Sequence, residues 1–168
     1  ITEYQAALEL RPNNSDLLIG LGNIFLRQMK YPEATDCFRR SVKNDPRNAL
    51  AQLKLGDALL LNRKAEEAIP HLRAAVDLDS SMVQAHARLG KSFALLGKYE
   101  DAVRELELAL NLDEDGSIHY QLGTFYNKLG QKGKAMVTLK KSQKLRKENL
   151  KKQQLQVMGM RPNREGIP

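Results

Sequence analysis

The side chains best suited to catalysis or metal binding are scattered along this chain rather than grouped. Its three histidines, His71, His86 and His119, form no His-x-x-x-His pair, and Cys37 is the single cysteine. A structural zinc ion needs about four such ligands together, and a nucleophile needs a base within reach. The sequence therefore predicts no metal site and no enzymatic activity, and we expect no cofactor.

These reactive groups have structural explanations as well. Cys37 has no partner for an internal disulfide, and we interpret it as a small buried hydrophobe. His86 and His119 stand at equivalent places of a repeating pattern, where large apolar residues are usual. We therefore interpret both rings as packing positions rather than as ligands.

Any functional site would have to be positioned by structural elements, and the sequence pattern of these elements recurs along the chain. A Leu-Gly pair recurs four times at nearly even spacing, and an alanine follows each glycine at a fixed distance in the sequence. The glycines are Gly22, Gly56, Gly90 and Gly123, and the alanines are Ala34, Ala68, Ala102 and Ala135. A period of about 34 residues is typical of stacked helix pairs. Because glycine inside a helix costs roughly 1 kcal/mol relative to alanine, we expect close packing there, with each glycine facing its alanine.

These residues resemble the tetratricopeptide repeat (TPR) family. The repeat at residues 15–48 carries the family pattern at Leu18, Leu21, Gly22, Phe25, Ala34, Phe38, Ser41 and Pro46. The resemblance implies an all-α fold, a right-handed superhelical solenoid of antiparallel helix pairs. We expect these pairs at about 15–46, 49–80, 83–112 and 117–147.

The same pattern predicts the domain organisation. A TPR array covers residues 1–147, with the second helix of a truncated repeat at 1–14 and repeats at 15–48, 49–82, 83–115 and 116–147. A basic C-terminal extension follows at 148–168. Because the chain opens with half a repeat and with Ile1, we expect it to be a piece of a longer protein.

Binding is the usual role of this family, through a concave surface lined by the first helix of each pair. Matching the repeats place by place predicts a ligand groove formed by Asn23, Arg27, Leu53, Asp57, Lys91, Tyr120, Thr124, Asn127 and Lys128. The asparagines could bond a peptide backbone, and Lys91 or Arg27 could pair with an acidic group. Some leucines at these places could instead belong to the core between repeats.

One TPR subclass binds the acidic C-termini of chaperones through a carboxylate clamp. Its five places read Ile19, Asn23, Lys54, Gln84 and Arg88 here, and only Asn23 and Arg88 match. One repeat later no place matches. We therefore expect a groove without this clamp.

Charge is divided unevenly along the chain. Residues 1–115 carry a net charge of −3, whereas residues 116–168 carry +10. We expect a basic helix from about Lys132 to about Met158 that ends near Gly159, then a loop over residues 161–168. No aromatic residue interleaves with the densest charges, so base stacking is unsupported. We interpret the helix as a solvated end of the array, and contact with nucleic acid or an anionic membrane stays open.

The first residues predict an uncovered surface. Tyr4, Ala7 and Leu8 fall on a helix that lacks its preceding partner, so we expect apolar surface there, covered by a second copy of the chain in a homo-oligomer. The chain has no apolar run of about 18 residues that could cross a membrane. A soluble, cytoplasmic protein is favoured, although nothing in the sequence decides the compartment.

Together these patterns predict a non-enzymatic protein-interaction scaffold that binds a protein or peptide segment in the concave groove. Two alternatives remain. The chain could be a structural or self-association element of a larger protein, or its basic end could bind nucleic acid or anionic lipid.

Overall fold

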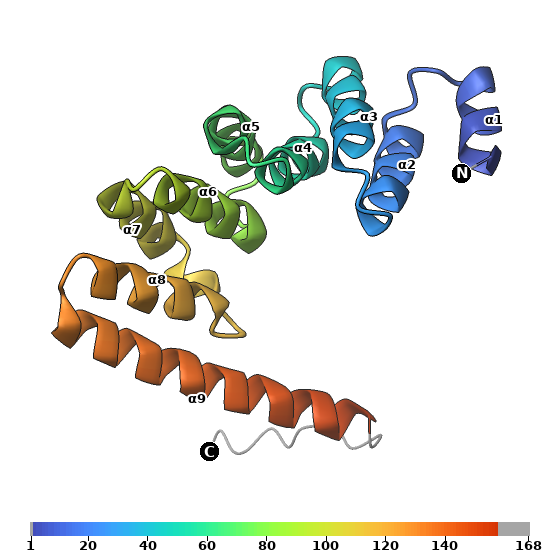
Figure 1. The fold of residues 1–168 in the computed structure, drawn as a ribbon. Coiled ribbons are helices and arrows are strands. Elements are labelled where there is room, and N and C mark those ends of the chain that lie inside the picture. Colours follow the sequence, from blue (N-terminus) through green and yellow to red (C-terminus); the bar gives the residue numbers. More distant parts are fainter. Residues whose placement is uncertain (1, 158–168) are drawn as a thin grey trace.

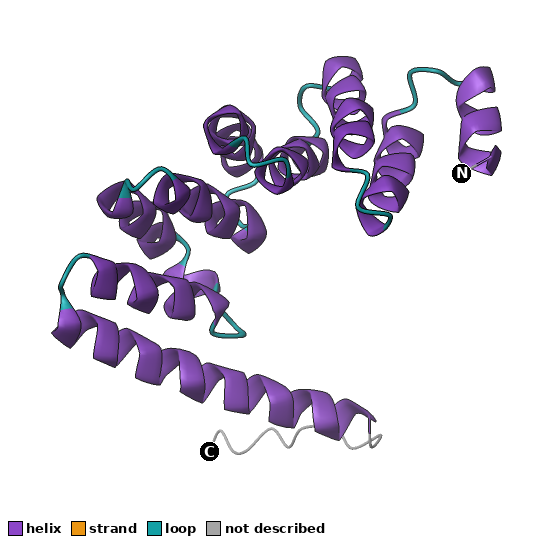
Figure 2. Cartoon of the chain, viewed as in Figure 1, coloured by secondary structure: helices purple, strands orange, loops and turns teal. Residues whose placement is uncertain are grey.

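The computed structural model describes residues 2–157. Within these residues Figure 2 shows helices and connecting loops, and no strand. In chain order the elements are α1 (Thr2–Leu10), α2 (Ser15–Arg27), α3 (Tyr31–Asn44), α4 (Ala49–Leu61), α5 (Ala65–Leu78), α6 (Val83–Leu95), α7 (Tyr99–Leu108), the 3₁₀ turn η1 (Leu110–Leu112), α8 (Ser117–Lys128) and α9 (Lys132–Val157). They match the predicted helix pairs, and the chain leaves its helix before Pro46 as expected.

Local chemistry sets where these helices begin and turn. The side chain of Asn14 accepts a hydrogen bond from the Leu17 amide at the start of α2, and Asn48 does the same for Ala51 at the start of α4. The short turn inside each pair contains one residue with positive φ; in the third pair this is Gly97, at 74°. Glycine adopts this left-handed conformation without steric cost.

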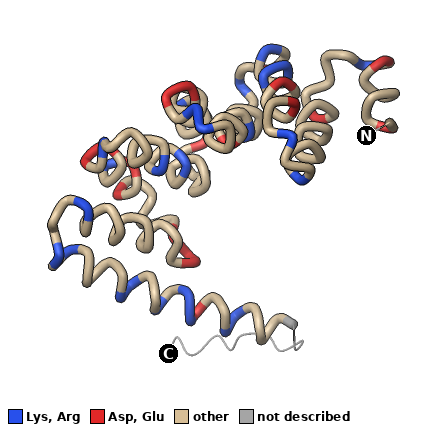
Figure 3. The backbone as a smooth tube through the Cα atoms, viewed as in Figure 1, with Lys and Arg blue, Asp and Glu red and all other residues tan. Residues whose placement is uncertain are grey.

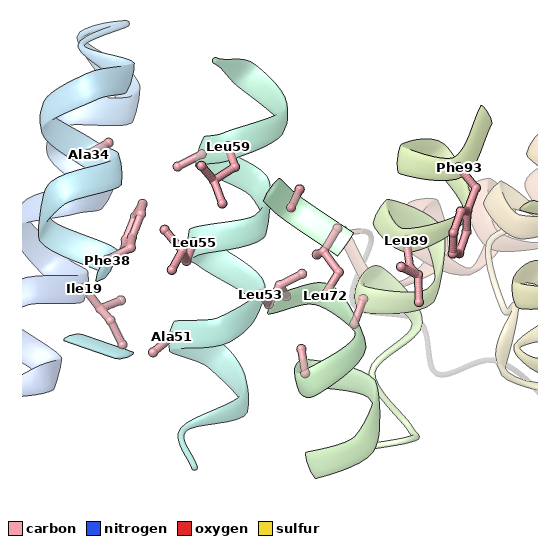
Figure 4. Packing of buried hydrophobic residues seen from close by; sticks show 14 of the residues in the cluster. Ile19, Ala34, Phe38, Ala51, Leu53, Leu55, Leu59, Leu72, Leu89 and Phe93 are labelled. Atoms are coloured by element: carbon pink, nitrogen blue, oxygen red, sulfur yellow. The ribbon is translucent and has the colours of Figure 1, made fainter. Parts of the chain in front are cut away.

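The helices follow one another along a curved array, in which α2, α4 and α6 lie on the inner side and α3, α5 and α7 on the outer side (Figure 1). Apolar side chains from successive pairs form a continuous core rather than a single centre. Figure 4 shows Phe38 of α3 and Leu55 of α4 facing one another across neighbouring repeats, with Leu72 and Leu89 continuing the row. Each repeat therefore buries part of its apolar surface against its neighbours.

The packing at the helical glycines differs in detail from the prediction. A Cβ atom on Gly56 would lie 2.5 Å from Cγ of Leu72, and one on Gly22 would lie 2.6 Å from Cε1 of Phe38. Each glycine thus faces the large residue four places beyond the predicted alanine, which is itself fully buried. At Gly90 and Gly123 the backbone carbonyl oxygen of the paired alanine, Ala102 or Ala135, also lies 3.3 Å from the Cβ position, so the glycine borders both the expected alanine and the larger residue.

The N-terminal helix is also better covered than expected. Leu8 is buried in a cluster with Leu18 and Leu21, and Tyr4 packs against this cluster with its ring over Gly20. The expectation of exposed apolar surface was therefore wrong for Leu8, because α1 turns it onto α2, whereas Tyr4 and Ala7 are half-buried and Leu10 is 85 % exposed. A homo-oligomer through this helix stays a prediction.

At the other end, α9 is a single helix of 26 residues that extends well past α8 (Figure 1). The Ser142 hydroxyl donates to the Gly116 carbonyl at 2.6 Å and ties the two helices together. Leu139 is half-buried, whereas its counterpart Leu106 is fully buried, since no further described helix covers α9. The long basic helix is as predicted; its expected end near Gly159 and the loop at 161–168 lie outside the described residues.

Candidate ligand-binding groove

The inner helices present a row of hollows along the concave side of the array. The first hollow, of about 250 Å³, lies among α2, α4 and α6. Its walls are Leu26, Asp57, Leu60, Leu61, Arg88 and Lys91. Leu61 is 49 % exposed, so its apolar surface is available to a ligand.

The second hollow, of about 220 Å³, lies one repeat further along, between α6 and α8. Its walls are Lys91, Ala94, Leu95, Tyr99, Thr124, Phe125 and Lys128. Leu95 is 58 % exposed, and the rings of Tyr99 and Phe125 pack at a centroid distance of 6.1 Å. This hollow is therefore mostly apolar, with an ammonium group at each side.

A third, more open hollow of about 610 Å³ lies at the rim, where the turn between α4 and α5 meets the end of α6. The exposed charged residues Arg63, Lys64 and Glu67 contribute to its walls, and Lys64 pairs with Glu67 at 2.9 Å. Lys91 lines this hollow and both of the others. It therefore stands at the centre of the concave surface.

Charge in the two inner hollows is predominantly positive. Arg88 Nε lies 2.5 Å from Asp57 Oδ1, and this pair neutralises the single carboxylate in the walls of these hollows. Lys91 and Lys128 form no ion pair within residues 2–157. Their ammonium groups remain available to an anionic ligand.

The structure brings together four of the predicted groove residues. Asp57 and Lys91 meet in the first hollow, and Lys91, Thr124 and Lys128 meet in the second. The sequence analysis did not assign Phe125 and Tyr99 to the groove. Phe125 lies one residue after a predicted groove place, and only the packing of α8 on α6 turns its ring toward the hollow.

Other predicted positions lie apart from these hollows. Asn23 is half-buried on α2, and Arg27 and Asn127 are exposed, but none of the three lines a hollow described above. Leu53 was wrongly assigned as a groove residue: it is only 2 % exposed and belongs to the core between repeats. Close packing of the neighbouring helices leaves it no surface for a ligand.

Tyr120 is exposed, but a side chain of the same protein already covers its ring. The guanidinium carbon of Arg146 on α9 lies 4.9 Å from the ring centroid, within the range of a cation–π interaction. The end of the predicted groove in the fourth repeat is therefore bordered by α9. A ligand there would have to displace Arg146 or bind beside it.

The repeat pattern matches a known family along most of the chain. Models of the tetratricopeptide repeat match residues 1–49, 19–83 and 53–117, and another matches residues 116–149. The chain belongs to the tetratricopeptide repeat family. A comparison with curated protein sequences gave no match.

Solved TPR structures share the fold of this chain. MamA superposes with a TM-score of 0.82 at 23 % identity, covering 88 % of this chain and 87 % of its own. YrrB, described as a TPR protein with an unusual peptide-binding site, gives 0.74 at 24 % identity, covering 88 % and 76 %. The first TPR of Spaghetti (RPAP3), bound to the HSP90 peptide SRMEEVD, gives 0.66 at 27 % identity, covering 69 % and 93 %. The predicted right-handed solenoid of antiparallel TPR helix pairs is thus confirmed.

The histidines and the cysteine lie away from the concave hollows. Cys37 is buried, and this burial raises the pKa of its thiol to about 11, so it is a poor nucleophile. His86 is buried as predicted for a packing position. His119 departs from the prediction, because its Nδ1 lies 2.6 Å from Oδ2 of Asp113, whose side chain is fully buried.

Asp113 is a structural residue that the sequence analysis missed. Its carboxylate also accepts a hydrogen bond from the His119 amide at 2.8 Å, which holds the turn before α8. Burial of a carboxylate is costly unless it is paired in this way. No spacing signal in the sequence pointed to it, because the pairing depends on how the turn after α7 folds back onto α8.

Neither metal binding nor membrane insertion has structural support in the described residues. Residues 2–157 hold no group of three or more His, Cys, Asp and Glu side chains that could bind a metal ion. In the same range no helix is both long and apolar enough to cross a membrane. Figure 3 shows the lysines and arginines of α9 spread along the helix, whose middle lies beside the acidic turn before α8.

Proposed function

We propose that this TPR protein is a non-enzymatic interaction scaffold that binds a peptide or protein segment across its concave groove. The observation that carries the proposal is the pair of inner hollows, in which exposed leucines stand beside unpaired ammonium groups. Contact with water is unfavourable for the exposed apolar surface of Leu61 and Leu95, and a bound apolar side chain would cover this surface. An acidic or carbonyl group of the same ligand could meet Lys91.

The size of the hollows favours side chains of a longer ligand over a whole small molecule. Volumes of about 250 and 220 Å³ fall below the ~300–1,000 Å³ typical of small-molecule pockets. The rim hollow is larger, but exposed charged side chains wall much of it. A chain that crosses several repeats can place one side chain in each inner hollow.

Relatives in fold support the same kind of ligand. YrrB is described as having an unusual peptide-binding site, and the structure of the Spaghetti TPR contains a bound heptapeptide. Membership of the TPR family adds support, because interaction through the concave surface is the usual role of its members. These are properties of those proteins, and for this chain they motivate the proposal.

The proposed ligand is an internal segment rather than a free C-terminus. Two clamp places that require a lysine hold Ile19 and Gln84, and neither side chain carries the positive charge that would form an ion pair with a carboxylate. Arg88, which does match, already pairs with Asp57. The groove therefore lacks the concentrated charge that fixes a terminal carboxylate.

Selection of binders from a displayed random peptide library tests the proposal. We expect the intact chain to enrich peptides that bind it in solution, and the Leu61→Ser/Lys91→Glu variant to lose them while keeping its helical circular dichroism spectrum. The matched control is Lys140→Glu/Lys147→Glu, which reverses two exposed charges on α9.

The two variants separate the groove from the basic helix. If the selected peptides bind Leu61→Ser/Lys91→Glu at wild-type strength, the groove proposal fails. If, in addition, they no longer bind the α9 control, the basic helix is the interaction surface. Binding that weakens steeply with salt in that case would indicate that charge attraction dominates the contact with α9.

A further inference from the structure

We infer that the groove recognises an acidic segment in a polyproline II conformation, with two apolar side chains three residues apart seated in the two inner hollows. This inference rests on the proposed function and deepens it by specifying the chemistry and spacing of the ligand. It follows from three properties of the hollows: their repeat register, their separation and their charge.

The two hollows are the same structural feature, one repeat apart. In the first, Leu60 and Leu61 end an inner helix, and Lys91 faces them from the next inner helix. In the second, Ala94 and Leu95 hold the equivalent places, and Thr124 faces them. A ligand that places one apolar side chain in the first hollow can therefore place another in the second hollow, one repeat further along the array. We call these two hollows the seats of the ligand's anchor side chains.

The length of that step sets the spacing of the anchors. α4 contacts α6 and α6 contacts α8, so the hollows are separated by about one interhelical distance, roughly 8–10 Å. A polyproline II helix advances about 3.1 Å per residue with three residues per turn, so side chains i and i+3 lie about 9 Å apart on the same side. In a β-strand, side chains i and i+3 point to opposite sides, and i and i+2 are only about 7 Å apart. Of these two extended conformations, polyproline II is the one that matches both the distance and the direction.

The charges around the hollows favour acidic residues in the same ligand. Lys91 stands between the two seats and Lys128 at the far side of the second, while Asp57 is neutralised by Arg88. An acidic side chain between the anchors can reach Lys91, and one beyond the second anchor can reach Lys128. A basic ligand would place its charge beside both ammonium groups and be repelled.

The peptides enriched in the library selection provide the first test, once binders that persist on Leu61→Ser/Lys91→Glu are removed. We expect the remaining sequences to share two apolar residues three apart, with acidic residues between and beyond them. Groove-dependent binders with another spacing, or with basic residues, would overturn this inference and leave the proposed function standing. If no binder depends on the groove, the proposed function itself fails, and this inference fails with it.

Synthetic peptides then measure the effect of each feature by fluorescence anisotropy. Moving one anchor of the most enriched peptide by a single residue should weaken binding about tenfold, since one apolar side chain loses its seat. Lys91→Glu should weaken it at least about fivefold, and this loss should shrink in high salt. Equal affinity for the shifted peptide would contradict the proposed spacing.

A matched pair of leucines separates loss of the seat from a general loss of apolar surface. Leu95→Ser removes a wall of the second hollow, whereas Leu108→Ser changes a leucine of α7 that is 68 % exposed and lines neither inner hollow. We expect weaker peptide binding for Leu95→Ser and unchanged binding for Leu108→Ser. Equal losses in the two variants would overturn the assignment of the second seat.

Discussion

The in-helix glycines allow a stability prediction whose size follows from the packing. In Gly56→Ala, the added Cβ would lie 2.5 Å from Cγ of Leu72, a side chain with no exposed surface. The clash reaches the branch point of Leu72, so the whole side chain must shift, and overpacking of this kind costs about 1–3 kcal/mol. Alanine recovers roughly 1 kcal/mol of helix propensity. With a clash near the upper end of that range, we expect a net loss of about 1–2 kcal/mol.

Two other glycines provide matched controls for this prediction. A Cβ on Gly133, in the first turn of α9, would meet no atom within 4 Å, so Gly133→Ala should stabilise the protein by about 0.3–1 kcal/mol. A Cβ on Gly123 would lie 2.6 Å from Cγ of Leu139, which is half-buried at the end of the array and can move toward solvent. Gly123→Ala should therefore cost less than Gly56→Ala.

Thermal unfolding followed by far-ultraviolet circular dichroism measures the series. For a chain of this size, each kcal/mol shifts Tm by about 2–4 °C, so Gly56→Ala should melt roughly 2–8 °C below the wild type. In the double variant Gly56→Ala/Leu72→Ala, the smaller partner removes the clash, and the loss should be less than the sum of the two single losses. The reasoning is refuted if Gly56→Ala stabilises the protein as much as Gly133→Ala does.

Three further predictions concern buried polar groups. His119→Phe should destabilise the protein by about 2–3 kcal/mol, measured by urea unfolding, because the buried Asp113 carboxylate loses its imidazole partner. Adding Asp113→Ala to the His119→Phe variant should recover part of this loss. Burial and the hydrogen bond to Glu107 raise the pKa of Tyr126 to about 12, so the folded state keeps this proton to a higher pH than the unfolded state does. The free energy of unfolding should therefore fall between about pH 10 and 12, and it should fall less steeply in Tyr126→Phe. Cys37, with its pKa raised to about 11 by burial, should react with a thiol reagent at pH 8 far more slowly in the folded protein than in urea, and equal rates would contradict its burial.

Repeat periodicity made most of the fold predictable. Each helix pair buries its apolar stripe against the adjacent pairs, so the same residue types must return once in every repeat, and their phase marks each helix. The turns at Gly97 and Pro46 followed the same logic, since local backbone preference decides them. Even α9 was predictable, because its polar composition and length mark the end of stacking.

The candidate site was predictable only in part. The predicted residues Lys91, Thr124 and Lys128 all line the second hollow, because equivalent places of successive first helices point toward the concave side. The prediction was wrong for Leu53. This residue holds the same repeat place as Tyr120, but Leu53 is buried and Tyr120 is exposed. Burial at that place depends on the size of the residues in neighbouring helices, which the pattern of one repeat does not contain.

The sequence by itself therefore determined the helices, their order and which helix of each pair lines the concave side, because these depend on short-range preference and on a repeating apolar stripe. Only the tertiary structure decided which side chains form the hollows and which serve other contacts. Arg146 covers Tyr120, Asp113 pairs with His119, and Arg88 engages Asp57. The first and third of these contacts join helices whose distance is set by the packing of the array, and the second depends on how the turn before α8 folds.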